Sequence, residues 1–336
     1  FAGGSCLIVP VVSVEGDPFP AGGEAQWLTR PDGAMLRVMT WGAHCAKAPC
    51  RGTVVLAGGR TEFIEKYFEV VDLLLQRGFA VATFDWRGQG LSSRMLDDPR
   101  KGHIDDFKTF DDDFAAFLSE IVQSRMPKPY IALGHSMGGN LMFRAAHDHG
   151  KDFAGVVLSA PMLGIHLGSP VMEAVTRTLV RVLCALGLKD RYAPGSGPAA
   201  ADEEPFDENV VTSDPERYAR QQRVIAKAPS IGLGGPTIGW VAASFSAIEE
   251  MSAAAYLSRI TVPVLAFEAG ADRLVQNEAV RRLVSALAHG QCISIPGSQH
   301  EILMEQEEFR FAFWDAFDRF VETLLSSTDR PLVLDF

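Results

Sequence analysis

The sequence of 336 residues predicts an α/β protein with a mostly parallel, doubly wound sheet and one helical insertion. Short apolar runs rich in β-branched residues alternate with segments whose apolar residues recur every three or four positions. This alternation is typical of parallel strands joined by helices. One long region lacks any strand-like run and interrupts the alternation. A third observation is a serine at the apex of a glycine-flanked turn between a strand-like and a helical segment, which places that side chain at the end of a sheet.

Strand-like runs cover residues 35–41, 53–57, 80–84, 130–134, 155–159, 262–267 and 292–295. Several of them are apolar throughout, as expected of parallel strands that are covered on both faces. The first strand or two are expected to run antiparallel to the others. Helices with one apolar stripe are predicted at residues 62–77, 105–125, 140–149, 277–289 and 307–325.

The region without strands predicts a domain in two parts. Residues 1–162 and 252–336 form the sheet domain, and residues 163–251 form a helical cap inserted between them. A helix is predicted at residues 170–188, with an apolar stripe that comprises Met172, Val175, Leu179, Val182, Leu183 and Leu186. We interpret this stripe as a face packed on the core. The alternative is that part of it lines an acyl pocket or touches lipid.

Composition excludes several classes of function. The net charge of −11 argues against a nucleic-acid surface, and any membrane contact would need apolar patches rather than charge. Five widely spaced cysteines without a Cys-x-x-Cys pair argue against a disulfide framework or a zinc site, and Cys45 and Cys50 would pair only in a secreted chain. Neither a signal peptide nor a transmembrane segment is predicted. We expect a cytoplasmic protein, peripheral at the inner membrane if it contacts lipid at all.

The glycine-flanked turn is residues 134–138, which read Gly-His-Ser-Met-Gly. A turn this sharp strains the backbone of Ser136, and the flanking glycines avoid collisions with the neighbouring strand and helix. The hydroxyl then lies at a helix N-terminus, where free N–H groups stabilise an anion. The competing interpretation is a glycine-rich turn with an incidental serine.

A serine hydroxyl becomes a nucleophile only with a base in hydrogen-bond reach and an acid that fixes the tautomer of that base. In doubly wound hydrolases the chain order is serine, acid, histidine. Asp272, in the turn after the strand 262–267, is the predicted acid. Glu268 is the alternative acid, and a surface ion pair of Asp272 with Arg273 is the non-catalytic interpretation. His300 is the predicted base, because it alone among the histidines follows both the acid and a last strand, and lies in a turn.

Negative charge that develops on a substrate needs two backbone N–H donors. Met137, the residue after the serine, is predicted to provide the first. The second is predicted to come from Arg60, in the glycine-rich loop after the strand 53–57. Asp85 and Arg87, in another turn after a strand, are expected to fix their own loop.

Together these motifs resemble the α/β-hydrolase superfamily and, within it, the monoacylglycerol-lipase group with its bacterial lysophospholipases. The resemblance covers residues 27–321. It is carried by residues 59–62 (Gly-Arg-Thr-Glu), 85–90 (Asp-Trp-Arg-Gly-Gln-Gly), 134–139, 270–272 and 300–303, and by the cap runs 211–218 and 234–237. One departure is the pair Gly58-Gly59, where monoacylglycerol lipases typically carry His-Gly.

The resemblance implies hydrolysis of a single acyl ester, from a lysophospholipid or a monoacylglycerol, through an acyl-enzyme on Ser136 and without a metal or cofactor. The expected partner is this small lipid substrate. Three alternatives stay open. They are an aminopeptidase that holds a free amine with Asp202, Glu203 or Glu204, an acyltransferase, and a catalytically inactive receptor with the same fold. A dehalogenase or epoxide hydrolase is disfavoured, because those enzymes carry a carboxylate where Ser136 stands.

Overall fold

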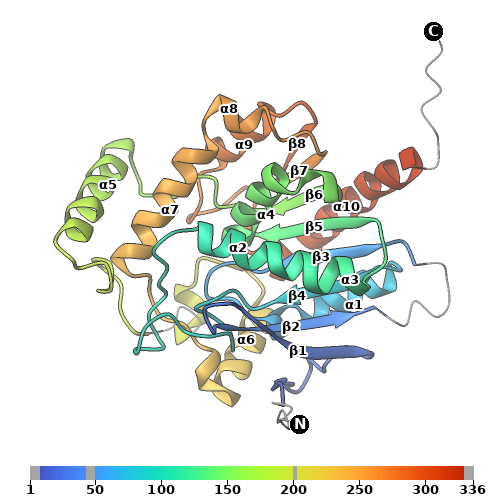
Figure 1. Ribbon diagram of the computed structural model, residues 1–336, viewed down its shortest axis with the longest axis horizontal. Coiled ribbons are helices and arrows are strands. Elements are labelled where there is room, and N and C mark those ends of the chain that lie inside the picture. Colours follow the sequence, from blue (N-terminus) through green and yellow to red (C-terminus); the bar gives the residue numbers. More distant parts are fainter. Residues whose placement is uncertain (1–7, 43–49, 200–202, 329–336) are drawn as a thin grey trace.

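The computed structural model describes residues 8–42, 50–199 and 203–328. Within them, eight strands form one sheet in the order β1-β2-β4-β3-β5-β6-β7-β8 (Figure 1). The strands are β1 (Gly23–Thr29), β2 (Met35–Trp41), β3 (Thr53–Ala57), β4 (Ala80–Phe84), β5 (Tyr130–His135), β6 (Phe153–Ser159), β7 (Val264–Ala269) and β8 (Gly290–Ile295). The predicted α/β class with a mostly parallel sheet is confirmed.

The strand directions also follow the prediction. β1 pairs antiparallel with β2, β2 pairs antiparallel with β4, and the pairs from β4 to β8 are parallel. β1 itself is missing from the predicted strands. It lies at the edge of the sheet and most of its residues are partly exposed, so it lacks the continuous apolar run that marks the central strands.

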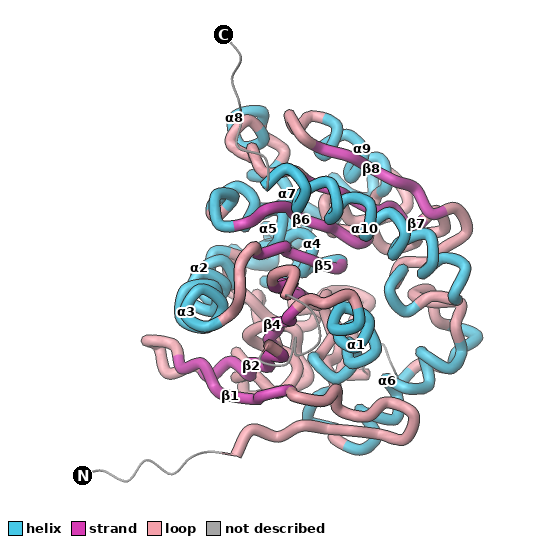
Figure 2. Tube along the Cα trace, turned by 90° about the vertical axis from the view of Figure 1, so that its right-hand side faces the viewer, coloured by secondary structure: helices cyan, strands magenta, loops and turns pink. Residues whose placement is uncertain are grey.

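Helices cover both faces of the sheet (Figure 2). On one face lie α1 (Phe68–Gln76) and α10 (Glu307–Thr328), joined by an ion pair of 2.9 Å between Arg77 and Asp318. On the other face lie α2 (Lys108–Ala116), α3 (Gln123–Arg125) and α4 (Ser136–Asp148). The predicted helix 105–125 contains a π-helical section at Phe117–Val122, and the predicted helix 62–77 begins as a 3₁₀ turn at Ile64–Tyr67. α9 (Asn277–Ser285) is shorter than the predicted helix 277–289.

The segment between β6 and β7 contributes helices and, among its described residues, no strand of the sheet. Its main helices are α5 (Pro170–Ala185), α6 (Pro215–Lys227) and α7 (Ile238–Met251), followed by α8 (Ala254–Leu257). α5 lies beyond the sheet and packs against α7 (Figure 1). α7 in turn joins the main core through Trp240, Ile248 and Met251.

The apolar stripe of α5 faces solvent. Between 42% and 68% of the surface is exposed in Met172, Val175, Leu179, Val182 and Leu186. α5 meets α7 through another side, where Val180 is buried against Ile238 and Phe245 and where Leu183 packs on the same cluster. The interpretation that the stripe packs on the core is therefore wrong for these five exposed residues and holds only for Leu183.

No helix in the described part of the chain is long and apolar enough to cross a lipid bilayer. Cys184 and Cys292 are free thiols. Cys45, one partner of the alternative pair with Cys50, lies outside the described residues.

Candidate active site

Ser136 lies at the sharp junction between β5 and α4. Its φ is 52°, in the left-handed region that strains a residue with a side chain. A β-carbon at Gly134 would lie 2.5 Å from the Gly138 carbonyl oxygen, and one at Gly138 would lie 2.3 Å from the Ala57 carbonyl oxygen. Both positions therefore require glycine, and the junction holds Ser136 close to the end of β3.

The structure brings Ser136, His300 and Asp272 into one hydrogen-bonded chain. His300 Nε2 lies 2.9 Å from Ser136 Oγ, and His300 Nδ1 lies 2.7 Å from Asp272 Oδ2. Asp272 follows β7 and His300 follows β8, so neighbouring parallel strands deliver both side chains to the same edge of the sheet. When Nδ1–H donates to the carboxylate, Nε2 is left to accept the Ser136 proton.

The environment of Asp272 keeps its carboxylate charged. Its side chain is fully buried, and Oδ1 accepts hydrogen bonds from the backbone N–H groups of Leu274 and Val275 at 2.8 and 3.0 Å. Burial acts to raise the pKa of Asp272, but the hydrogen bond and charge of His300, with these backbone donors, lower it below its usual value. An ionised Asp272 can therefore fix the His300 tautomer at neutral pH.

Glu268, the alternative acid, points elsewhere. It lies within β7, and its buried carboxylate pairs with Arg281 Nη1 at 2.5 Å and accepts a hydrogen bond from Cys292 Sγ at 3.2 Å. A side chain in a strand points out of one face of the sheet, whereas the turn after β7 places Asp272 at the end of the sheet, within reach of His300. Arg273, the proposed ion-pair partner of Asp272, is exposed.

The loop that contains Arg60 lies directly against Ser136. A β-carbon at Gly59 would lie 3.1 Å from Ser136 Cβ, which shows how closely the loop backbone approaches. Met137 lies in the first turn of α4, where backbone N–H groups have no partner within the helix. Arg60 and Met137 thus flank Ser136. The Arg60 side chain leads away to the helical segment between β6 and β7, where Nη2 donates to the Gly234 carbonyl oxygen at 2.5 Å.

Several residues that hold this loop were not among the predicted site residues. Gln89 Nε2 donates to the carbonyl oxygens of Gly59 and Glu62 at 2.6 and 3.2 Å, and Trp86 Nε1 donates to that of Gly58 at 2.9 Å. Glu62 Oε2 accepts the Gly59 N–H. Gln89 and Trp86 belong to the turn 85–90, so the motif could have drawn attention to them, but sequence alone does not show which loop they contact.

A buried group of charges lies behind His300. Lys66 Nζ forms ion pairs with Glu62 Oε1 at 2.9 Å and with Glu301 Oε1 at 2.6 Å, and the centroids of the His135 and His300 rings lie 4.8 Å apart. Burial acts to raise the pKa of Glu62, but Lys66 and His135 lower it to about 2. Burial lowers the pKa of His135 to about 4, so this ring is neutral at pH 7. Glu62, His135 and Glu301 have the donor atoms for a metal ion, but the Lys66 ammonium already supplies the positive charge there.

Asp85 fixes its own loop as predicted, because its Oδ2 accepts the Leu91 N–H at 2.8 Å, but Arg87 joins the loop to Asp113 and Asp32 in other segments, so for Arg87 the prediction is wrong. Asp85 Oδ1 accepts the Ile64 N–H at 2.9 Å, and its Oδ2 lies 2.8 Å from Arg37. Arg87 donates to Asp113 at 2.7 Å.

The acidic run considered as an amine-binding group lies partly outside the described residues, which omit Asp202. Glu203 is exposed and pairs with Arg100 at 2.9 Å. Glu204, also exposed, accepts a hydrogen bond from Tyr218 Oη through its backbone carbonyl. These contacts fit a solvated acidic run better than a site for a free amine.

The sheet, the strained serine turn and the order serine, acid, histidine define a member of the α/β-hydrolase superfamily. Within the superfamily, residues 48–307 match the family described as serine aminopeptidase, S33, and the chain belongs to this family. Lysophospholipase L2 of Escherichia coli K12 is 36% identical over 277 residues, which span 79% of this chain and 80% of that protein. A monoacylglycerol lipase of Mycolicibacterium smegmatis is 29% identical over 77% of this chain and 84% of its own length.

Solved structures agree with the fold. A soluble variant of Saccharomyces cerevisiae monoglyceride lipase, in complex with a substrate analogue, superposes with a TM-score of 0.71 at 20% identity, over 91% of this chain and 96% of that one. The monoacylglycerol lipase of Paleococcus ferrophilus gives a TM-score of 0.64 at 25% identity, over 87% of this chain and 98% of that one. The predicted fold, the family resemblance and the enzyme class, a serine ester hydrolase, are confirmed by these comparisons.

Proposed function

We propose that the chain hydrolyses the single acyl ester of a lysophospholipid or a monoacylglycerol, with Ser136 as nucleophile, His300 as base and Asp272 as the acid that orients it. The observation that carries this proposal is the hydrogen-bonded chain from Ser136 Oγ through both nitrogens of His300 to Asp272. Two relatives support the substrate class, because they are named as a lysophospholipase and a monoacylglycerol lipase.

In the first half of the reaction, His300 Nε2 takes the proton of Ser136 as Oγ attacks the ester carbonyl carbon. The carbonyl oxygen becomes an oxyanion, to which the N–H groups of Arg60 and Met137 donate. His300 then gives its proton to the leaving alcohol, the ester C–O bond breaks and the acyl group stays on Ser136.

In the second half, His300 removes a proton from water, and the resulting hydroxide attacks the acyl-enzyme carbonyl. The tetrahedral species collapses as His300 returns the proton to Ser136 Oγ, which releases the fatty acid. The sheet domain, residues 1–162 and 252–336, would carry this chemistry, and residues 163–251 would form the cap under which the acyl tail binds.

A substrate panel tests this function. Purified protein would be given lysophospholipids, monoacylglycerols and aminoacyl anilides, with Ser136→Ala as the blank. We expect fatty-acid release from the acyl esters and none from the anilides. Release of amines instead would establish the aminopeptidase, and transfer to an added alcohol in preference to water would establish the acyltransferase. Failure of a fluorophosphonate to label Ser136 in folded protein would establish the inactive receptor.

We further propose that the α5 face makes peripheral contact with a lipid surface. Its exposed side chains form a shallow apolar groove lined by Pro170, Val171, Ala174, Val175, Thr178, Leu179 and Val182. An exposed apolar face of this kind favours insertion at the boundary between headgroups and acyl chains. The net charge of −11 disfavours attraction to anionic lipid, so the contact is apolar in origin.

Val175→Glu with Leu179→Glu is expected to weaken binding to phosphatidylcholine vesicles about tenfold or more, because two charges would have to leave water. Sedimentation of the protein with vesicles measures this. Turnover of a short ester in solution should stay unchanged. Phe311→Glu is the matched control, because Phe311 is an apolar residue with 74% of its surface exposed on α10, outside the cap. Equal vesicle binding by the double variant and the wild type would contradict the proposed contact.

A further inference from the structure

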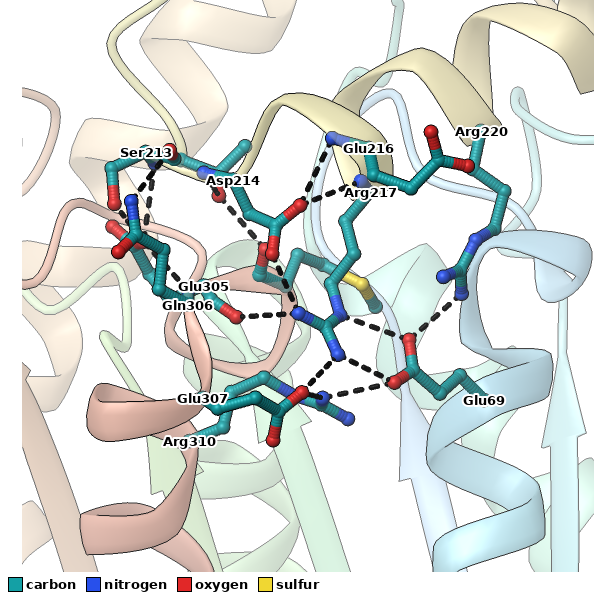
Figure 3. Close-up of polar contacts among 12 residues, drawn as sticks. Glu69, Ser213, Asp214, Glu216, Arg217, Arg220, Glu305, Gln306, Glu307 and Arg310 are labelled. Atoms are coloured by element: carbon teal, nitrogen blue, oxygen red, sulfur yellow. Dashed lines mark hydrogen bonds and ion pairs between the residues drawn. The ribbon is translucent and has the colours of Figure 1, made fainter. Parts of the chain in front are cut away.

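The cap segment that leads into α6 is bonded along its length to the loop that carries His300. Glu301 directly follows His300, and its N–H donates to the Val211 carbonyl oxygen at 2.7 Å. Thr212 Oγ1 donates to the Met304 carbonyl oxygen at 2.8 Å. The two stretches, residues 211–217 and 299–306, are far apart in the sequence and lie side by side in the structure (Figure 3).

One buried carboxylate is the centre of this contact. Glu305 has no exposed surface, and its Oε1 accepts the Gln299 N–H at 2.7 Å. Its Oε2 accepts the N–H and the hydroxyl of Ser213 at 3.1 and 2.5 Å, and also the Gln306 N–H at 3.1 Å. Because Gln299 directly precedes His300, one oxygen of the Glu305 carboxylate holds the loop around the histidine. The other oxygen of the same carboxylate binds Ser213 in the cap segment.

Arg217 anchors the cap side of this contact to the sheet domain. Its guanidinium donates to both carboxylate oxygens of Glu69 in α1 at 2.9 and 2.7 Å, to Asp214 at 2.6 Å and to the Glu305 carbonyl oxygen at 3.1 Å (Figure 3). Burial acts to raise the pKa of Glu69, but Arg217, Arg310 and Arg220 lower it to about 2, so Glu69 stays charged. The segment 211–217 is therefore fixed relative to α1, and not only to the loop.

We propose that the cap segment 211–217 positions His300. Glu305 is the positioning residue that connects the two, because its carboxylate bonds Ser213 of the cap segment and Gln299 beside His300. This inference rests on the proposed function of the triad and goes beyond it, because it assigns part of the cap to the catalytic geometry. Without the cap segment, the loop would keep its own turn, the His300–Asp272 contact, the Ala271 N–H bond to the Ser298 carbonyl oxygen and the Lys66–Glu301 ion pair, but it would lose the bonds on both sides of Glu305. A displacement of about 1 Å in a reacting group costs about 100-fold in rate, so a loosened loop would lower turnover without loss of the fold.

The same contacts divide the cap into two parts. The α6 side is bound to the His300 loop, whereas α5 contacts α7 and otherwise exposes its apolar stripe. Access of a substrate would then involve the α5 side, while the α6 side keeps His300 in place.

The test compares Glu305→Gln with Glu307→Gln. Glu307 is a matched control, because its side chain is 75% exposed and its carboxylate pairs with Arg217 and Arg310, which lie outside the residues 299–306. For Glu305→Gln we expect kcat on a short soluble ester to fall about 10- to 100-fold, with KM within about twofold, since the amide NH₂ cannot accept the N–H and hydroxyl donors. Fluorophosphonate labelling of Ser136 should slow by the same factor. Glu307→Gln should stay within about twofold of the wild type in both assays.

A lower melting temperature with unchanged kcat and labelling rate would assign Glu305 a structural role only and overturn the inference. If Glu305→Gln does not fold, Ser213→Ala replaces it, because that change removes one donor and keeps the backbone N–H. We expect Ser213→Ala to slow labelling about 3- to 10-fold, and an unchanged rate would also overturn the inference. Wild-type protein that is not labelled would instead refute the proposed function, so the two failures are distinguishable.

Discussion

Replacing Asp272 with asparagine is expected to lower kcat about 10⁴-fold, with little change in KM. The asparagine amide would donate to His300 Nδ1 rather than accept from it. The remaining ring proton would then lie on Nε2, and this nitrogen could no longer accept the Ser136 proton. The fold should survive, because asparagine keeps the oxygen that accepts the Leu274 and Val275 N–H groups. Steady-state kinetics on a soluble ester, with a thermal melt for folding, measure both expectations.

Glu268→Gln is the matched control for this prediction. It removes a second buried acid near the end of the same strand, but that carboxylate pairs with Arg281 and Cys292. We expect kcat to stay within a few-fold of the wild type, with any cost appearing in the melting temperature. A large loss of kcat in Glu268→Gln together with a small one in Asp272→Asn would show that the acid has been assigned to the wrong residue.

The central sheet was predictable because its strands are buried on both faces. β3, β4 and β7 consist of buried residues throughout, so each one appears in the sequence as a mainly apolar run, in which Thr83 of β4 and Glu268 of β7 are the polar exceptions inside the strand. β1 has no such run, since it has one neighbour and partly exposed residues. The serine turn was predictable for a different reason. Its glycines are required by contacts within a few residues or with the adjoining strand, so the local sequence carries the signal.

Contacts between distant segments could not be predicted in the same way. The spacing of apolar residues in α5 correctly indicates a helix with an apolar stripe, but it does not show whether another element covers that stripe. Gln89 and Glu305 are polar residues in loops, and nothing near them in the sequence indicates that one supports Gly59 and the other supports Gln299. Their importance depends on which loops the fold places together.

Gly59→Ala is expected to lower kcat about 10²- to 10³-fold, the loss typical of removing one oxyanion donor. The new methyl group would lie 2.9 Å from Glu62 Oε2, 3.1 Å from Ser136 Cβ and 3.2 Å from His135 Cδ2. None of these neighbours can easily move. Ser136 is held by its strained turn, Glu62 is bonded to Tyr67 at 2.5 Å, and His135 is buried. The loop must therefore retreat, and the Arg60 N–H retreats with it.

Two further glycines separate this effect from a general loss of stability. A β-carbon at Gly58 would lie 3.1 Å from Tyr67 and 3.4 Å from Glu62 Oε2, which are nearer to it than Ser136, and one at Gly197 would meet no atom within 4 Å. Gly58→Ala should therefore reduce kcat less than about tenfold, and Gly197→Ala should leave it unchanged. The three variants would be compared by kcat and by the rate of fluorophosphonate labelling. If folded Gly59→Ala kept its kcat within a few-fold of the wild type, the second oxyanion donor would have to come from a different loop, because no methyl group fits here without displacing Arg60.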